Sequence, residues 1–155
     1  MPNIITEKFE SVIFTRSSGK PLYLVLHRSP DATEGNTWQL LRGIIPTGLS
    51  SLQSALNSLT THTGFNPMYV WAPNYIHSEY DAITDSISHL PVFAIEVAQQ
   101  RPVLSADFSD SRWVTAEQAI ELLRLTGQRS ALKAINDDIV TNSDRGIPYQ
   151  LKING

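Results

Sequence analysis

Hydrophobic residues in the first part of the chain occur in short runs that are broken by turn-forming residues. Two runs rich in β-branched and aromatic side chains lie within residues 10–28, on either side of the segment Ser-Ser-Gly-Lys-Pro at 17–21. Runs of this kind are typical of strands, and Gly followed closely by Pro is a turn signal. We therefore predict a β-hairpin over residues 10–28.

A different spacing begins at Ser50. Apolar residues then recur on one face of a helix, with the spacing i, i+3, i+4, i+7, at Leu52, Ala55, Leu56 and Leu59. Ser50 or Ser51 is suited to cap the N-terminus of such a helix, and Gly64 is suited to cap its C-terminus. The pattern predicts a helix with one buried face between these caps.

The second half of the chain combines both patterns. A long polar connection over residues 74–89 is expected to be a loop of the kind that carries binding residues. The other expected elements are strands at 66–73, 90–98 and 111–115 and helices at 116–125 and 127–140, with Thr115 as the cap of the first helix. Strands interspersed with helices in this order predict an α/β (α+β) fold, a mixed β-sheet flanked by helices on both faces.

Length and composition narrow the functional classes. A chain of 155 residues forms one domain, which we place at 1–141, followed by a C-terminal tail at 142–155 that is expected to be partly mobile. The formal net charge is −3 and the basic residues are scattered, which argues against nucleic-acid and membrane partners. Neither a membrane-spanning run nor a signal peptide is present, so we expect a cytoplasmic protein. The absence of cysteine excludes disulfides and thiolate chemistry.

The segment between Gly43 and Phe65 contains no Asp, Glu, Lys or Arg, although its glycines and apolar residues follow a known spacing. Gly43, Leu59, Gly64 and Phe65 match the glycine and apolar positions of the Nudix box, G-x5-E-x7-R-E-U-x-E-E-x-G-U, where U is apolar. The chain therefore resembles the Nudix hydrolase superfamily over roughly residues 10–140. The resemblance implies a Nudix-like α/β/α sandwich.

A second segment supports the same resemblance. Residues 107–114 read Asp-Phe-Ser-Asp-Ser-Arg-Trp-Val and resemble the E-H-x-x-Y-x-W segment before the last strand of many Nudix proteins. Asp107 stands at the Glu position and Trp113 at the Trp position. The subfamilies that this segment resembles most are the bacterial dATP and dihydroneopterin triphosphate pyrophosphohydrolases.

Every charged position of the Nudix box is neutral in this chain. These degenerate positions are Leu49, Asn57, Ser58, Thr61 and His62. The family hydrolyses a nucleoside diphosphate linked to another group with Mg²⁺ held by the helix glutamates, and Mg²⁺ requires oxygen ligands such as carboxylates. A single imidazole with neutral neighbours is a poor site for any divalent ion. We therefore name no catalytic residue, metal site or cofactor, and we do not expect the magnesium-dependent reaction. Mg²⁺ or Mn²⁺ would act only at a site rebuilt from other carboxylates.

Ligand contacts are expected from residues around the box. The candidate ligand-binding residues are Arg28, Trp38, Arg42, Gly43, Glu79 and Asp107. Arg28 matches an arginine that is frequent near the substrate in the family, and an arginine at position 42 suits bidentate pairing with a phosphate. Solvated arginines and acids and a packed tryptophan are the alternative interpretations of these residues. The histidines at 27, 77 and 89 lack metal-ligand spacing and are expected to be structural or exposed.

Three functions from different classes follow from these observations. The first is a Nudix-fold protein without catalysis that binds a nucleotide or a related diphosphate ligand. The second is a Nudix hydrolase that uses a rebuilt metal site, to which Asp107 and the acids of residues 74–89 would contribute. The third is an interaction module whose neutral surface around Ile44 and Leu49 packs against a partner or a second copy of the chain.

Overall fold

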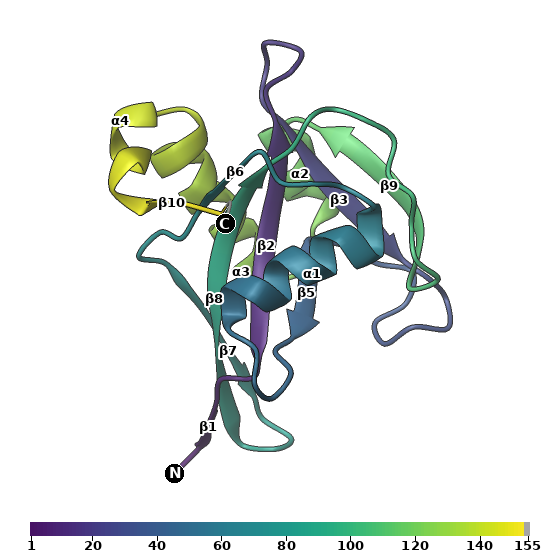
Figure 1. The fold of residues 1–155 in the computed structure, drawn as a ribbon. Coiled ribbons are helices and arrows are strands. Elements are labelled where there is room, and N and C mark those ends of the chain that lie inside the picture. The colour runs from purple at the N-terminus through teal and green to yellow at the C-terminus, as the bar shows by residue number, and fades with distance from the viewer. Residues whose placement is uncertain (154–155) are drawn as a thin grey trace.

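The computed structural model describes residues 1–153, which form a mixed β-sheet between two layers of helices (Figure 1). The strands are β1 (Asn3–Ile5), β2 (Lys8–Thr15), β3 (Leu22–Arg28), β4 (Trp38–Gln39), β5 (Leu41–Ile44), β6 (Tyr69–Trp71), β7 (Ile76–Asp81), β8 (Ser86–Glu96), β9 (Phe108–Val114) and β10 (Gln150–Leu151). The α-helices are α1 (Ser51–Thr63), α2 (Ala116–Leu122), α3 (Thr126–Ile135) and α4 (Ser143–Gly146). Helix α1 crosses one face of the sheet and α2 and α3 cover the other (Figure 1), so the predicted fold class is confirmed.

Strand β2 lies at the centre of the sheet. It pairs in parallel with β8 and antiparallel with β3 and β5. Its side chains alternate between two cores, with Phe9 and Ile13 packed in the core under α1 and Val12 and Phe14 in the core under α2 and α3. The alternation places Glu10 on the α3 face of the sheet, where it is fully buried. The predicted hairpin is confirmed as β2 and β3.

Helix α1 begins and ends where its sequence predicts. The hydroxyl of Ser50 accepts a hydrogen bond from the backbone N–H of Gln53, and the side chain of Gln53 accepts one from the N–H of Ser50. Gly64 ends the helix with a φ of 74°, a conformation that glycine adopts without strain. Leu59 and Ala55 are buried against the sheet, as the helical spacing requires.

The polar connection over residues 74–89 is not a loop, and that prediction was wrong. Its residues form β7 and the first part of β8, an antiparallel hairpin in which Glu79 lies opposite Ser88. Strand β1 pairs with the other edge of β8 in parallel. Most residues of β7 are exposed, so the strand lacks the alternation of apolar and polar residues that would have indicated it.

The C-terminal part adds two helices, as predicted. Thr115 caps α2, and α3 continues into a π-helical turn at Asn136–Val140. Beyond it, α4, a 3-10 turn at Ile147–Tyr149 and β10 follow, and β10 pairs with β6. The division into a domain at 1–141 and a tail at 142–155 stays a prediction, and residues 154–155 lie outside the described part. Among the described residues, no helix is long and apolar enough to cross a membrane.

Candidate functional site

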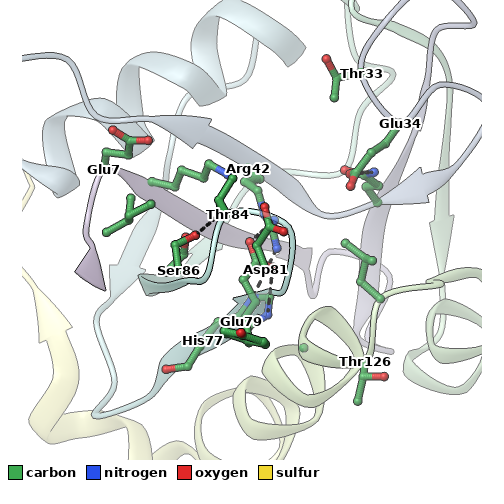
Figure 2. A pocket seen from close by; sticks show the side chains of 18 of the residues that line it. Glu7, Thr33, Glu34, Arg42, His77, Glu79, Asp81, Thr84, Ser86 and Thr126 are labelled. Carbon is green, nitrogen blue, oxygen red and sulfur yellow. Dashed lines mark hydrogen bonds and ion pairs between the residues drawn. The ribbon is translucent and has the colours of Figure 1, made fainter. Parts of the chain in front are cut away.

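A cleft with a volume of about 1230 Å³ opens beside the β7–β8 hairpin (Figure 2). Its walls come from the β7–β8 hairpin, from β5, from the segment that leads into β4 and from the N-terminal end of α3. Of the six candidate ligand-binding residues, Arg28, Arg42, Gly43 and Glu79 line this cleft, whereas Trp38 and Asp107 do not. The sequence therefore located part of the cleft, but not its floor.

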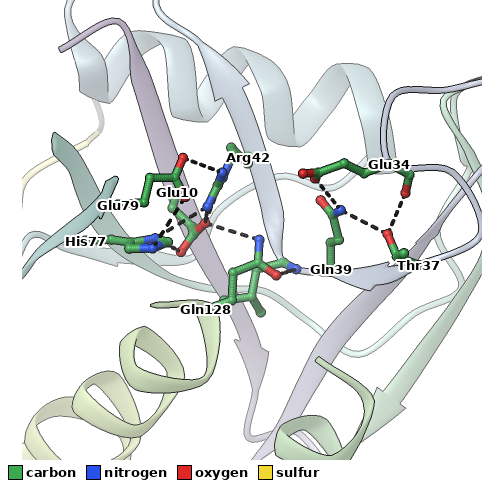
Figure 3. Close-up of polar contacts among 9 residues, drawn as sticks. Glu10, Glu34, Thr37, Gln39, Arg42, His77, Glu79 and Gln128 are labelled. Atoms are coloured by element: carbon green, nitrogen blue, oxygen red, sulfur yellow. Dashed lines mark hydrogen bonds and ion pairs between the residues drawn. The ribbon is translucent and has the colours of Figure 1, made fainter. Parts of the chain in front are cut away.

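The floor of the cleft is a network of ionic hydrogen bonds around Glu10 (Figure 3). The Glu10 carboxylate accepts from Arg42 Nε at 3.0 Å, from His77 Nδ1 at 2.9 Å and from Gln128 Nε2 at 3.2 Å. A second carboxylate, that of Glu79, accepts from Arg42 Nη1 at 3.0 Å. The guanidinium of Arg42 is thus held between two carboxylates, which occupy donors that a phosphate would otherwise need.

This network keeps a fully buried carboxylate ionised. Burial raises the pKa of Glu10, but the hydrogen bond from His77 and the positive charge of Arg42 lower it by more, so the pKa lies below its usual value of 4.5. Gln128, which is also fully buried, donates to Glu10 and accepts from the backbone N–H of Leu40 at 3.2 Å. The side chains that hold Glu10 therefore link β2, β5, β7 and α3.

A glycine on α3 makes room for the histidine of this network. A Cβ atom at Gly127 would lie 1.7 Å from Nε2 of His77, so only glycine allows the helix to approach so closely. His77 is 3% exposed and its Nε2 lies 3.7 Å from Glu79. The sequence predicted that His77 is structural or exposed. The structure shows that it is buried and bonded to Glu10, which the sequence did not indicate.

Two other cations of the cleft have no carboxylate partner. Arg28 donates from Nε to the backbone oxygen of Thr33 at 3.2 Å and lies over the ring of Phe108 at 5.2 Å. Within the described residues, neither Arg28 nor Lys8 forms an ion pair. These two side chains are therefore the cations of the cleft that are available to an anionic ligand.

The degenerate positions of the Nudix box lie outside the cleft. None of them lines it: Leu49, Asn57 and Thr61 are exposed, and Ser58 and His62 are partly buried. Gly43 is required for packing, because a Cβ there would lie 2.7 Å from the ring of Phe9. The exposed side chains of Ile44 and Leu49 leave an apolar surface between β5 and α1.

His62 forms a second polar cluster at the C-terminal end of α1. Its Nδ1 lies 2.7 Å from the hydroxyl of Ser105 and 3.9 Å from the carboxylate of Asp107. Burial lowers the pKa of His62, the charge of Arg28 lowers it further, and the charge of Asp107 opposes both. The pKa of His62 therefore lies below the usual 6.5, which favours the neutral imidazole.

The magnesium ion that the resemblance implies does not fit these residues. The box positions offer hydroxyl, amide, imidazole and leucine side chains, and none of them is a carboxylate. No group of three His, Cys, Asp or Glu side chains among residues 1–153 is arranged to hold a metal ion. Glu10 and Glu79 are already bonded to Arg42, so their oxygens are not available for coordination without breaking that network.

The candidate Trp38 and the box-related Trp113 both pack against other side chains. The ring of Trp38 lies edge-on to His27 at 4.9 Å and below the guanidinium of Arg112 at 4.7 Å. Trp113 stacks on Phe65 at 5.9 Å and donates from Nε1 to a backbone oxygen. Neither ring lines the cleft.

Solved structures that align with most of the chain include proteins whose names call them Nudix. RenU, a Nudix hydrolase from M. smegmatis, aligns with a TM-score of 0.71 at 16% identity, over 98% of this chain and 91% of its own. The dihydroneopterin triphosphate pyrophosphohydrolase of E. coli aligns with a TM-score of 0.69 at 13% identity, over 89% and 99%. The Nudix domain of NrtR from Shewanella oneidensis, solved with ADP-ribose, aligns with a TM-score of 0.67 at 18% identity, over 88% of each chain.

Neither a protein-family model nor a curated protein matches the sequence. The likeness therefore lies in the fold, across nearly the whole of each aligned chain. The chain has the Nudix fold.

Proposed function

We propose that this protein binds a nucleotide or a related diphosphate ligand in the cleft and does not hydrolyse it by the magnesium-dependent reaction. The observation that carries the proposal is that the cleft and the Nudix-box positions are separate regions of the molecule. A cleft of about 1230 Å³ with unpaired basic side chains lies beside β5, while the box positions on α1 carry no carboxylate. Binding needs the first region, and the metal-dependent reaction needs the second.

The cleft has the chemistry for a ligand that is partly anionic and partly polar. Arg28 and Lys8 offer charge to a phosphate, and hydroxyl groups such as those of Thr84 and Ser86 offer hydrogen bonds to a sugar (Figure 2). One structural neighbour was solved with ADP-ribose, and another is named for its action on dihydroneopterin triphosphate. Both ligand types contain the linked phosphates that the proposal requires.

The test measures binding and turnover on the same panel. Dissociation constants for ADP-ribose, GDP, ADP and diadenosine tetraphosphate are measured by calorimetry in EDTA and again with Mg²⁺. Release of phosphate or pyrophosphate is measured with Mg²⁺ and with Mn²⁺. We expect binding that persists in EDTA, and no turnover.

Arg28→Gln is the informative variant, because it removes an unpaired cation from the cleft but leaves the Glu10 network intact. Its affinity for the diphosphates should fall about tenfold or more, the size of one hydrogen bond to a charged group. Arg101→Gln, which removes a charge from an exposed residue outside the cleft, is the matched control. Equal affinities of the two variants would contradict the proposal.

A rebuilt hydrolase is the competing function, and Asp107 decides it. Metal-dependent turnover that is lost in Asp107→Ala would replace the binding proposal by a catalytic one.

An interaction module is the third function, supported by the exposed Ile44 (69%) next to α1. Sedimentation of the chain alone tests the homodimer that this surface would form. A cytoplasmic location and the absence of nucleic-acid partners remain predictions.

A further inference from the structure

One wall of the cleft holds a buried amide whose orientation is fixed. Gln39 is 7% exposed and donates from Nε2 to Glu34 Oε2 at 2.9 Å and to Thr37 Oγ1 at 3.0 Å. The hydroxyl of Thr37 donates its own proton to the backbone oxygen of Glu34 at 2.6 Å, so it can only accept from Gln39. A carboxylate also only accepts. Both partners therefore require the nitrogen of the amide, and its oxygen must point the other way.

That oxygen has no partner. Within residues 1–153, neither Oε1 of Gln39 nor Oε1 of Glu34 accepts a hydrogen bond, and both residues line the cleft. In Figure 3 the ends of the two side chains lie together. Among the described residues, the only enclosed side-chain atom without a partner is Oγ of Ser11, and Glu34 is exposed, so both oxygens are open to a donor from water or from a ligand in the cleft.

The two unused oxygens are both acceptors, and this restricts the ligand. Guanine presents two adjacent donors, the ring N–H and the 2-amino group, to such a pair. Adenine and cytosine present an amino group next to a ring nitrogen that only accepts, which would face an acceptor oxygen of the protein. A site built to receive a hydrogen bond discriminates strongly against a ligand that lacks the donor.

We propose that Glu34 and Gln39 form a base-recognition subsite for a 2-amino-4-oxopyrimidine edge, the edge of guanine. The subsite names the ligand class for the proposed nucleotide-binding function, on which it rests. Glu34 supplies the charged acceptor, Gln39 supplies the neutral one, and Thr37 fixes the geometry of both.

The experiment compares three nucleotides that differ only in the base edge. Dissociation constants of GDP, IDP and ADP are measured by calorimetry in EDTA. IDP keeps the ring N–H but lacks the 2-amino group, so the expected order of affinity is GDP, then IDP, then ADP. Neopterin carries the same edge on another ring system and shows whether the edge or the purine is recognised.

Two variants test the two acceptors separately. In Glu34→Gln an amide replaces the free carboxylate oxygen, and the ratio of GDP to ADP affinity should fall about tenfold or more, because the amide can donate to the ring nitrogen of adenine. In Gln39→Met the carbonyl acceptor is lost with little change in volume, and GDP binding should weaken while ADP binding does not. Urea unfolding of both variants shows that each remains folded. Glu121→Gln removes an equal charge from α2, outside the cleft, and should leave the ratio unchanged.

The outcomes separate this subsite from the broader proposal. If GDP and ADP bind equally well and both variants keep that ratio, the subsite is wrong while nucleotide binding stands. If none of the nucleotides binds, both proposals fall. A preference for GDP that disappears in Glu34→Gln but persists in Glu121→Gln supports the subsite.

Discussion

The cleft floor and the C-terminal end of α1 each contain a histidine beside a carboxylate, yet the two pairs differ in environment. His77 is 3% exposed and lies 2.9 Å from Glu10, which has no exposed surface. His62 is 21% exposed and lies 3.9 Å from Asp107, which is 57% exposed. Water screens the interaction between His62 and Asp107. It has little access to the pair of His77 and Glu10 and does not compete for their hydrogen bond. The same two residue types therefore form a structural centre in one region and a weak surface contact in the other.

This difference shows where the ionic chemistry of the chain resides. The resemblance directs attention to α1, where the family carries its charges, but here the buried charges lie on the opposite face of the sheet, under α3. Arg42 connects the two regions, since it precedes Gly43 of the box in sequence but is bound by Glu10 and Glu79 in space. We expect the floor to govern stability and the unpaired cations on the walls to govern binding.

The largest effect should come from removing Glu10. In Glu10→Ala the partly buried guanidinium of Arg42 loses its most buried partner, and loss of one member of a buried ion pair costs about 3–5 kcal/mol in the free energy of unfolding. Urea unfolding at pH 7 measures the change. Glu121→Ala, on the exposed side of α2, should stay within about 0.5 kcal/mol of the wild type. A loss below about 1 kcal/mol in Glu10→Ala would mean that the floor is not the structural centre.

A smaller loss is expected from Gly127→Ala. Its added methyl group would overlap His77, and overpacking of a buried site costs about 1–3 kcal/mol even though alanine favours the helix. The double variant with His77→Ala should recover part of this loss, because the methyl group then has space. Unfolding of the two single variants and of the double variant gives the coupling directly. Additive losses would show that His77 and Gly127 do not share one packing constraint.

The ionised state of Glu10 gives a gradual effect with pH. Its pKa is lowered in the folded state, so its contribution is complete above the unfolded value of 4.5 and is lost as the pH falls through the lower folded value. The difference in unfolding free energy between the wild type and Glu10→Gln should therefore narrow as the pH is lowered below about 4.5. Urea unfolding at intervals between pH 7 and pH 3 measures it. A difference that stays constant over this range would show that folding leaves the pKa of Glu10 unchanged, and a change in the opposite direction would show that the carboxyl is neutral in the folded protein.

The elements with local signals were predictable from the sequence, and those set by distant partners were not. Ser50 and Gly64 were recognisable as the two ends of α1, because capping depends on neighbouring residues only. The partners of Glu10 are 32, 67 and 118 residues away along the chain, at Arg42, His77 and Gln128. No spacing rule connects them. Glu10 next to a run of apolar residues in the predicted hairpin was an available signal, because a buried acid requires partners.

The β7–β8 hairpin shows a second limit of sequence patterns. Its residues are polar because much of their surface faces solvent or the cleft, and this composition is also typical of a loop. Pairing with β1 and the contact of Glu79 with Arg42 hold it in place. Arg28, Arg42 and Gly43 were located through the resemblance, whereas Glu34 and Gln39 carry no motif.

The smallest expected effect is also the most selective, and it concerns the end of α1. Asp107 raises the pKa of His62 and Arg28 lowers it, while burial is the main cause of its low value. Asp107→Asn should therefore lower the pKa of His62, and Arg28→Gln should raise it. Titration of the imidazole C–H signals by NMR measures both shifts.

His62→Gln identifies the signal of His62, and this substitution should leave the signals of the other histidines in place. Each shift should be below one unit, because Asp107 is mostly exposed to water and a full unit corresponds to about 1.4 kcal/mol. Shifts in the same direction in both variants would show that the two charges do not act on the ring, and that burial alone sets its titration.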